Sequence, residues 1–180
     1  MAETITVKVQ PLNAEAFRPY GQVVEGMQMV YPETEEGRVA LEMLHFKYRP
    51  DAKRTEQLAI HFSYNQTFIP LRGSMVLLVA PPPHNRTHGP ESYELDYERL
   101  AAFLVEPGQA AFIHKGTWHN AVALSPDCTL INVTRKNAGE GLSPTTEHAG
   151  GRIEHEAASR PYIEFVDLKK RDNRVIELDL

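Results

Sequence analysis

The sequence predicts a single, mostly β domain, and two observations favour this fold class. Short runs rich in Val, Ile, Leu and Phe recur along the 180 residues, and turn-forming residues separate them. No internal repeat of fixed period accompanies these runs, so a repeat architecture is not indicated. A chain of this length normally forms one domain whose core needs no disulfide support. The fold class is therefore all-β, with only a few short helices between strands.

The first half of the chain predicts one helical turn among strands. Residues 4–9 alternate in the manner of a strand, and residues 13–17 predict a helical turn because Asn13 is a favourable N-cap. Residues 27–37 are rich in Glu and contain Pro and Gly, which predicts a surface loop. The uninterrupted apolar run 75–80 predicts a strand buried on both faces. Further strands are expected at 23–24, 39–48, 58–64 and 66–71.

Turn signals also organise the second half. Residues 81–90 predict an exposed loop, and a short helix near residue 97 leads into strands at 102–105, 110–113, 117–124 and 129–133. Residues 136–160 are expected to be irregular because Gly, Ser, Pro and Thr dominate there. The segments 162–168 and 175–180 predict a terminal hairpin, added to the barrel or to a dimer partner. We therefore expect a barrel over residues 1–135 and a C-terminal extension, 136–180, packed on the same domain.

Composition excludes several classes of partner. The net charge is −5 and the Lys and Arg residues are scattered, so we expect no nucleic-acid partner. The N-terminus lacks the pattern of a secretory signal, and no run approaches the roughly 18 apolar residues of a membrane span. These features predict a cytoplasmic protein without a membrane partner. The lone Cys128 cannot form a disulfide framework or a zinc cluster.

Two spaced motifs carry the most information about function. The first is His61-Phe-Ser-Tyr-Asn-Gln66 with Gly73 downstream, and the second runs from Gly108 to Gly116-Thr-Trp-His119. This spacing resembles the two signature motifs of the cupin superfamily. The resemblance implies a cupin-like jelly-roll β-barrel in which His61 and Gln66 on one hairpin meet His119 from a second hairpin. Inward polar residues in so narrow a barrel need each other, a metal or a substrate.

The metal content of such a site has two readings. Two imidazoles and an oxygen suit a divalent ion such as Ni, Mn, Fe or Zn, so His61, Gln66 and His119 are candidate metal ligands. Metal-binding cupins typically carry a further His at the position of Ala59, so the alternative is a metal-free pocket in which the three residues bond each other and a ligand. The three residues include no carboxylate, and Glu42 and Glu56 are candidates to supply one from a neighbouring position.

Residues near the second motif are candidates for contact with the substrate. Trp118 is interpreted either as a wall of the pocket or as part of the core. His114 precedes a turn and is expected to reach the pocket mouth. Asn120 follows His119 directly, and with Gln66 these residues form the predicted substrate-binding set.

The motifs and their surroundings together resemble the ureidoglycolate lyase family. The resemblance extends over about residues 5–135 and includes Pro11-Leu-Asn-Ala-Glu-Ala-Phe17, His61 to Gly73 and Gly116-Thr-Trp-His119. It implies a cupin-like homodimer that splits ureidoglycolate into glyoxylate and urea during the breakdown of allantoin, a part of purine metabolism, with help from nickel or a similar ion. The chain departs from the family pattern at Ala59-Ile60, where an acidic residue and a basic residue are usual, at Asn120 and at Thr134.

Cleavage of this carbinolamide requires a base for the hydroxyl proton and an acid for the departing nitrogen. The resemblance therefore makes His119 and His61 candidates for catalysis, as proton carriers or metal ligands, with Gln66 orienting the substrate. The leading hypothesis is a carbon–nitrogen lyase of this type. The alternatives are a related cupin acting on another small hydroxy or ureido acid, a non-catalytic cupin that binds a small molecule, and an iron-dependent cupin isomerase or dioxygenase.

Overall fold

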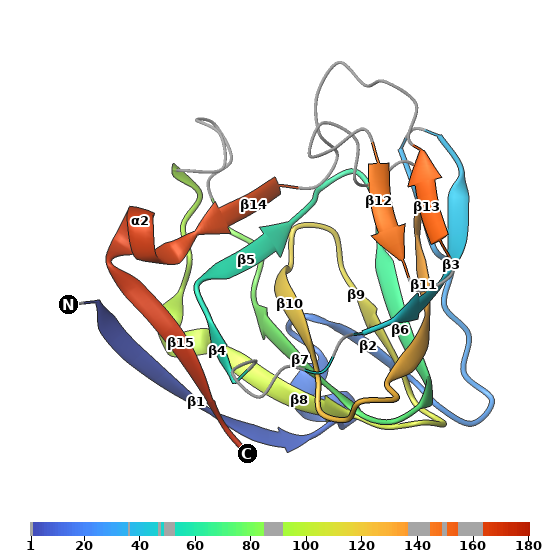
Figure 1. Cartoon of the computed structure of the whole chain (residues 1–180), viewed down its shortest axis with the longest axis horizontal. Helices are drawn as coiled ribbons and strands as arrows, with labels where there is room; N and C mark the ends of the chain where they lie inside the picture. The colour runs from blue at the N-terminus through green and yellow to red at the C-terminus, as the bar shows by residue number, and fades with distance from the viewer. Residues whose placement is uncertain are drawn as a thin grey trace.

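The structure is a computed structural model, and it describes residues 2–35, 37–46, 48, 53–84, 92–136, 145–148, 151–154 and 164–180. Two curled sheets face each other and enclose most of the core (Figure 1). The larger sheet has the order β14-β5-β10-β7-β8-β1-β15-β4, and the smaller has the order β2-β9-β6-β11-β3. The predicted all-β fold with a few short helices is confirmed.

The strands of the larger sheet are β1 (Glu3–Pro11), β4 (Arg54–Thr55), β5 (Gln57–Ile60), β7 (Met75–Ala80), β8 (Ala101–Val105), β10 (Trp118–Ala123), β14 (Glu164–Asp167) and β15 (Arg174–Asp179). Those of the smaller sheet are β2 (Gly21–Val24), β3 (Val39–His45), β6 (Gln66–Arg72), β9 (Ala110–Ile113) and β11 (Thr129–Arg135). A separate pair is β12 (Thr145–His148) with β13 (Gly151–Glu154), and the helices are α1 (Ala14–Phe17), the 3-10 turn η2 (Tyr97–Arg99) and α2 (Leu168–Asp172). The predicted N-cap of the first helical turn is confirmed, since the Asn13 side chain accepts a hydrogen bond from the backbone N–H of Ala16 at 2.9 Å.

Strand β7 divides the core into two clusters, as its continuous apolar run predicts. All six of its residues are buried. Met75, Leu77 and Val79 pack between the two sheets, whereas Val76, Leu78 and Ala80 pack on the other face, against a cluster that includes residues of β1, β14 and β15. Because successive side chains of a strand point to opposite faces, one strand supplies both clusters. The space between the sheets is therefore apolar along β7, and its polar part lies elsewhere.

Gly73 makes the tight turn between β6 and β7 that its place in the first motif predicts. Its φ is +67°, a left-handed conformation that favours glycine. A Cβ at this position would lie 3.0 Å from the Cα of Cys128, so the turn also packs closely on the loop before β11. This turn carries the chain from β6 in the smaller sheet to β7 in the larger sheet, so the two strands do not pair as the expected hairpin.

The C-terminal strands join the larger sheet, but not as a hairpin. β14 pairs antiparallel with β5, and β15 pairs parallel with β1 and antiparallel with β4. The predicted terminal hairpin is therefore wrong: α2 separates the two strands, and each finds a partner far away in the sequence. Residues 145–148 and 151–154 form the β12–β13 pair, so this part of the segment predicted to be irregular is regular. The predicted division of the chain at residue 135 stays a prediction.

No helix among the described residues is long and apolar enough to cross a membrane.

Candidate functional site

The structure brings His61, Gln66 and His119 together inside the barrel. His61 follows the end of β5, Gln66 opens β6 and His119 lies in β10, so three separate strands converge. The His61 Nε2 atom lies 2.9 Å from Gln66 Oε1, and the centroids of the two imidazole rings are 4.9 Å apart in an edge-to-face arrangement. All three side chains are buried. Two motifs that are more than 40 residues apart in sequence thus form one polar cluster.

Backbone carbonyls hold both imidazole rings by the same nitrogen. The Nδ1 atom of His61 lies 3.0 Å from the carbonyl oxygen of Tyr64, and the Nδ1 atom of His119 lies 2.9 Å from that of Thr117. A carbonyl oxygen only accepts hydrogen bonds, so the contact to Thr117 places the proton of a neutral His119 on Nδ1 and leaves a lone pair on its Nε2. His61 has an acceptor at each ring nitrogen, the Tyr64 carbonyl at Nδ1 and Gln66 Oε1 at Nε2, and a neutral ring donates to only one of them. The Tyr64 ring also stacks on His61, with centroids 3.8 Å apart, and fixes its plane.

Burial keeps both histidines neutral near pH 7. It lowers the pKa of His61 to about 3, with a further contribution from the neighbouring His119, and hydrogen bonds to Gln66 and Tyr64 oppose the shift. Burial also lowers the pKa of His119 to about 4, against the hydrogen bond to Thr117. A neutral imidazole with a free Nε2 lone pair, as in His119, is able to accept a proton or ligate a metal. Neither ring is a permanent cation near pH 7.

A line of hydrogen bonds runs from His61 across the inner face of the smaller sheet. Gln66 Nε2 donates to Asn132 Oδ1 at 2.9 Å, and Asn132 Nδ2 donates to Glu42 Oε2 at 2.9 Å. The strand register makes this possible, because Asn132 of β11 lies directly opposite Glu42 of β3. Sequence reasoning considered Glu42 as a substitute carboxylate but missed Asn132. Glu42 does reach the site, although only through two amides.

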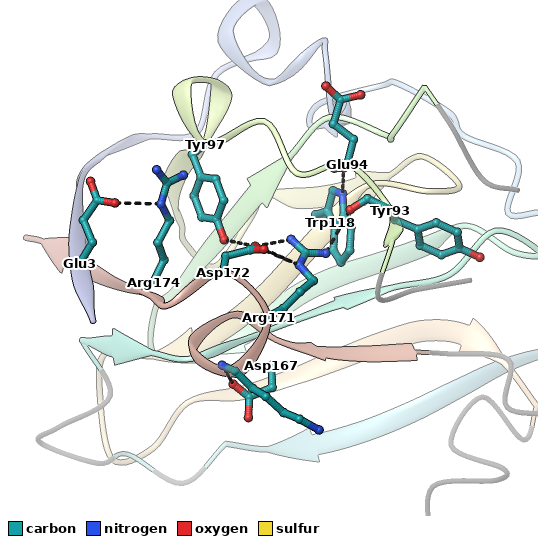
Figure 2. A network of polar contacts seen from close by, with 10 residues as sticks. Glu3, Tyr93, Glu94, Tyr97, Trp118, Asp167, Arg171, Asp172 and Arg174 are labelled. Atoms are coloured by element: carbon teal, nitrogen blue, oxygen red, sulfur yellow. Dashed lines mark hydrogen bonds and ion pairs between the residues drawn. The ribbon is translucent and has the colours of Figure 1, made fainter. Parts of the chain in front are cut away.

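Trp118 belongs to the core and helps to hold the strand that carries His119. Its indole Nε1 donates to the carbonyl of Glu94 at 3.1 Å, and the guanidinium of Arg171 in α2 lies 5.6 Å from the ring centroid (Figure 2). Arg171 Nη1 also donates to the carbonyl of Tyr93 at 3.0 Å. Trp118 faces away from the barrel interior, since it packs in the cluster on the other side of the larger sheet from β7 residues such as Leu77. The C-terminal helix therefore braces β10 from outside.

The network around α2 continues to the N-terminus. Asp172 accepts hydrogen bonds from the Tyr97 hydroxyl at 2.6 Å and from Arg171 Nε at 2.9 Å, and Arg174 donates to Glu3 Oε2 at 3.0 Å (Figure 2). Arg174 also lies over the Tyr97 ring, 4.4 Å from its centroid. These contacts tie η2, α2 and the two terminal strands into one support for the larger sheet.

The other predicted contact residues lie outside the histidine cluster. Asn120 donates to Thr55 Oγ1 at 2.7 Å and lines a pocket of about 350 Å³. This pocket is lined by Arg54, Thr55, Glu56, Gln57, Ala59, Asn120, Phe165 and Asp167. Ala59 is directly opposite His119 in the β5–β10 register, so the pocket comes within one residue of the cluster. His114 is exposed in the turn after β9, with its ring 6.2 Å from Phe112.

The donor set of the cluster fits a divalent metal. Metal-ligating histidines typically donate their second ring N–H to a carbonyl or carboxylate, and both rings here have that arrangement through Nδ1. The remaining donors are His61 Nε2, His119 Nε2 and Gln66 Oε1, a set that suits Ni, Mn, Fe or Zn. Within the described part of the chain, no group of three or more His, Cys, Asp or Glu residues is placed to hold a metal, so any such ion would depend on the Gln66 amide.

Comparison with known proteins identifies the family. The ureidoglycolate lyase family model matches residues 27–149. The chain belongs to this family. The matched region contains both motifs, and with them His61, Gln66 and His119. The resemblance predicted from the motifs is therefore confirmed.

Curated relatives of the family member agree with this assignment. The ureidoglycolate lyase of Azotobacter vinelandii is 25% identical over 174 residues, which cover 86% of this chain and 98% of the relative. A relative from Agrobacterium fabrum is 30% identical over 145 residues, which cover 76% of this chain and 86% of the relative. The ureidoglycolate lyase of Burkholderia mallei is 25% identical over 157 residues.

Among solved structures, the similarities are more distant. A Bacillus subtilis oxalate decarboxylase, studied for its Mn(II) centres, matches 89% of this family member and 30% of its own chain, with a TM-score of 0.39 and 10% identity. A dTDP sugar isomerase from Desulfovibrio desulfuricans matches 78% of this chain and 84% of its own, also with a TM-score of 0.39 and 10% identity.

Proposed function

We propose that this chain is a ureidoglycolate lyase that splits ureidoglycolate into glyoxylate and urea, in the breakdown of allantoin and other purine products. The observation that carries the proposal is the convergence of His61, Gln66 and His119 inside the barrel of a chain that belongs to this family. The proposal includes the cytoplasmic location that the sequence predicts.

The reaction moves one proton from oxygen to nitrogen. The carbinol hydroxyl loses its proton as its C–O bond becomes a carbonyl, and the electrons of the C–N bond leave with the urea nitrogen, which takes up a proton. We assign His119 Nε2 to remove the hydroxyl proton, because Nδ1–H donation to Thr117 leaves Nε2 as the basic atom. The same nitrogen then returns the proton to the departing urea, so the enzyme ends in its starting state.

Gln66 and His61 orient the reacting groups in this proposal. Gln66 Oε1 accepts a hydrogen bond from a substrate N–H or O–H, and its position is held by the bond from its own Nε2 to Asn132. The pocket lined by Arg54, Ala59 and Asn120 is the space that we assign to the small acid, because Ala59 is the strand partner of His119. Burial of the cluster excludes water, which strengthens each polar contact with the substrate.

A divalent ion held by His61 Nε2, Gln66 Oε1 and His119 Nε2 would supply Lewis-acid polarisation of the substrate hydroxyl and lower its pKa. His119 Nε2 cannot ligate a metal and carry the proton at once. If His119 carries the proton, activity persists after EDTA removes the metal; if His119 is a metal ligand, EDTA abolishes activity.

The decisive assay measures glyoxylate release from racemic ureidoglycolate, with added Ni²⁺ or Mn²⁺ and in parallel with EDTA. We expect release, and activity that persists in EDTA assigns His119 as the proton carrier. Activity that requires Ni²⁺ or Mn²⁺ assigns His119 as a ligand. If no condition releases glyoxylate, the proposed reaction is wrong. Other hydroxy and ureido acids are then tested for turnover, and a rise in melting temperature without turnover would identify a non-catalytic binding protein.

We also propose that the chain forms a homodimer. Strand β3 is at the edge of the smaller sheet within the described residues, and its side chains Val39, Leu41 and Met43 are exposed. An unpaired edge with apolar side chains favours pairing with another chain, and a second copy covers it by symmetry. Light scattering coupled to size exclusion is expected to give twice the chain mass, and a monomer at high concentration would refute the proposal.

A further inference from the structure

We propose that Glu42 is a positioning residue for Gln66: through Asn132, its carboxylate fixes which atom of the Gln66 amide faces His61. The inference concerns the site of the proposed function, and it rests on that site's hydrogen bonds rather than on the identity of the substrate.

The direction of the hydrogen-bond line starts at Glu42. A carboxylate only accepts, so the Asn132 atom that faces Glu42 Oε2 at 2.9 Å has to be the donor Nδ2. This leaves Asn132 Oδ1 toward Gln66, where it accepts from Gln66 Nε2 at 2.9 Å. Turning either amide over would set two acceptors or two donors against each other. Each amide orientation therefore follows from the one before it.

Burial makes this direction costly to change. Gln66 and Asn132 are 7% and 5% exposed, so water does not readily replace a lost hydrogen bond at either side chain. Both lie on the inner face of the smaller sheet, where the β3–β11 register sets Asn132 opposite Glu42 and the β6–β11 register sets Phe68 opposite Asn132. The backbone thus holds the three polar side chains in line.

This chain of hydrogen bonds determines which atom of Gln66 faces His61. Gln66 presents its oxygen, not its NH₂ group, at 2.9 Å from His61 Nε2. An amide oxygen is a metal ligand and a hydrogen-bond acceptor, whereas an amide NH₂ group is neither. Two acceptor atoms this close require a proton or a cation between them, so the orientation set by Glu42 favours binding of a positively polarised group. Glu42 therefore acts on the site indirectly, through Asn132 and Gln66, whereas the family usually has an acidic residue at the position of Ala59.

Three variants separate this role from a general effect on folding. In Glu42→Gln the new amide is able to donate, so Asn132 and Gln66 are free to turn and to present NH₂ to His61. In the double variant Glu42→Gln/Asn132→Asp, the carboxylate at position 132 accepts from both neighbours, so the original Gln66 orientation is restored. Glu177→Gln, at an exposed position of β15, is the matched control for the charge change.

The direct readout is the position of the Gln66 side-chain amide protons in the metal-free, ¹⁵N-labelled protein. We expect nuclear Overhauser contacts from these protons to Asn132 in the wild type and in Glu177→Gln, new contacts to the His61 ring in Glu42→Gln, and a return to the first pattern in the double variant. An identical pattern in all four proteins, or contacts to His61 in the wild type, would overturn the proposal.

Titration with Ni²⁺ gives a second readout. We expect Glu42→Gln to weaken Ni²⁺ binding about 10- to 100-fold, as loss of an outer partner of a metal ligand typically does, and the double variant to recover it. Equal Ni²⁺ affinity in wild type and Glu42→Gln would count against the proposal. If the four proteins show the expected amide pattern but none of them, wild type included, releases glyoxylate, the positioning role stands and the proposed reaction fails.

Discussion

Replacing His119 with asparagine is expected to lower kcat/KM for ureidoglycolate by roughly 10²- to 10⁴-fold, the usual contribution of a positioned general acid–base group. Asparagine is chosen because its side-chain NH₂ is able to keep the hydrogen bond that His119 Nδ1 makes to the carbonyl of Thr117. It removes only the distal atom, Nε2, to which we assign the proton. The loss should therefore appear in kcat at unchanged secondary structure by circular dichroism.

The control for this variant is His45→Asn. His45 is an exposed histidine of β3, bonded to Thr129 Oγ1 at 2.9 Å and outside the cluster, so its replacement should leave turnover unchanged. Full turnover by His119→Asn would show that Nε2 carries no essential proton. A loss of Ni²⁺ affinity in parallel with activity would instead assign His119 as a ligand.

The spacing of residues within the two motifs predicted that His61, Gln66 and His119 lie close together. His61, Gln66 and His119 meet because tight turns at Gly73 and near Gly116 carry the chain between the two sheets, and both glycines have positive φ. Such turns depend on a few neighbouring residues, so they can be predicted from the sequence. The barrel follows from the same turns together with the apolar runs between them.

Asn132 and the role of Glu42 could not be predicted in this way. Asn132 lies between the apolar residues Ile131 and Val133 of β11, and its importance comes from the register that sets it opposite Glu42, 90 residues away in sequence. Register between distant strands depends on the packing of the whole barrel. A lone amide alternating with Leu130 and Thr134 on a buried strand was the available signal, since a buried polar group requires a partner.

The error at the C-terminus has the same origin. Two strands separated by a short polar segment favour a hairpin on local grounds, and the segment 169–174 looked like its turn. Instead Asp167 caps α2 by accepting from the backbone N–H of Lys170, and Arg171 and Asp172 of this helix bond to Tyr93 and Tyr97. These tertiary contacts direct β15 to the N-terminal strand β1, which no local pattern indicates.

The two buried histidines should make the protein sensitive to mild acid. Their pKa values in the folded protein, about 3 for His61 and about 4 for His119, lie below the value near 6.5 of an unfolded chain. Between these limits the unfolded chain binds more protons than the folded one, so the free energy of unfolding falls as the pH falls. The stability that the two neutral histidines contribute is fully present above about pH 6.5. It is lost progressively as the pH falls, until the pH lies below the pKa values of the folded protein.

The expected slope is large. Each histidine contributes about 1.4 kcal/mol per pH unit within this window, so the pair contributes roughly 3 kcal/mol per unit. Urea unfolding at pH 7.5, 6.5, 5.5 and 5.0 measures it, and the variant His61→Gln/His119→Asn should show a much flatter profile. Equal slopes in the wild type and the double variant would mean that the histidines are not buried in the neutral form.

A partly buried carboxylate outside the histidine cluster, Asp172, separates the histidine effect from general acid unfolding. Burial tends to raise the pKa of Asp172, but hydrogen bonds from Arg171 and Tyr97 outweigh it and hold the pKa below its ordinary value. The stability that Asp172 provides is therefore lost only as the pH falls through the ordinary carboxyl range, near pH 4 and lower. Asp172→Asn should lower stability by a similar amount at pH 7.5 and at pH 5.0 and leave the slope between them unchanged. If the pH dependence of the free energy of unfolding changes in Asp172→Asn and not in the histidine variant, the acid sensitivity comes from the contacts of α2 and not from the histidine cluster.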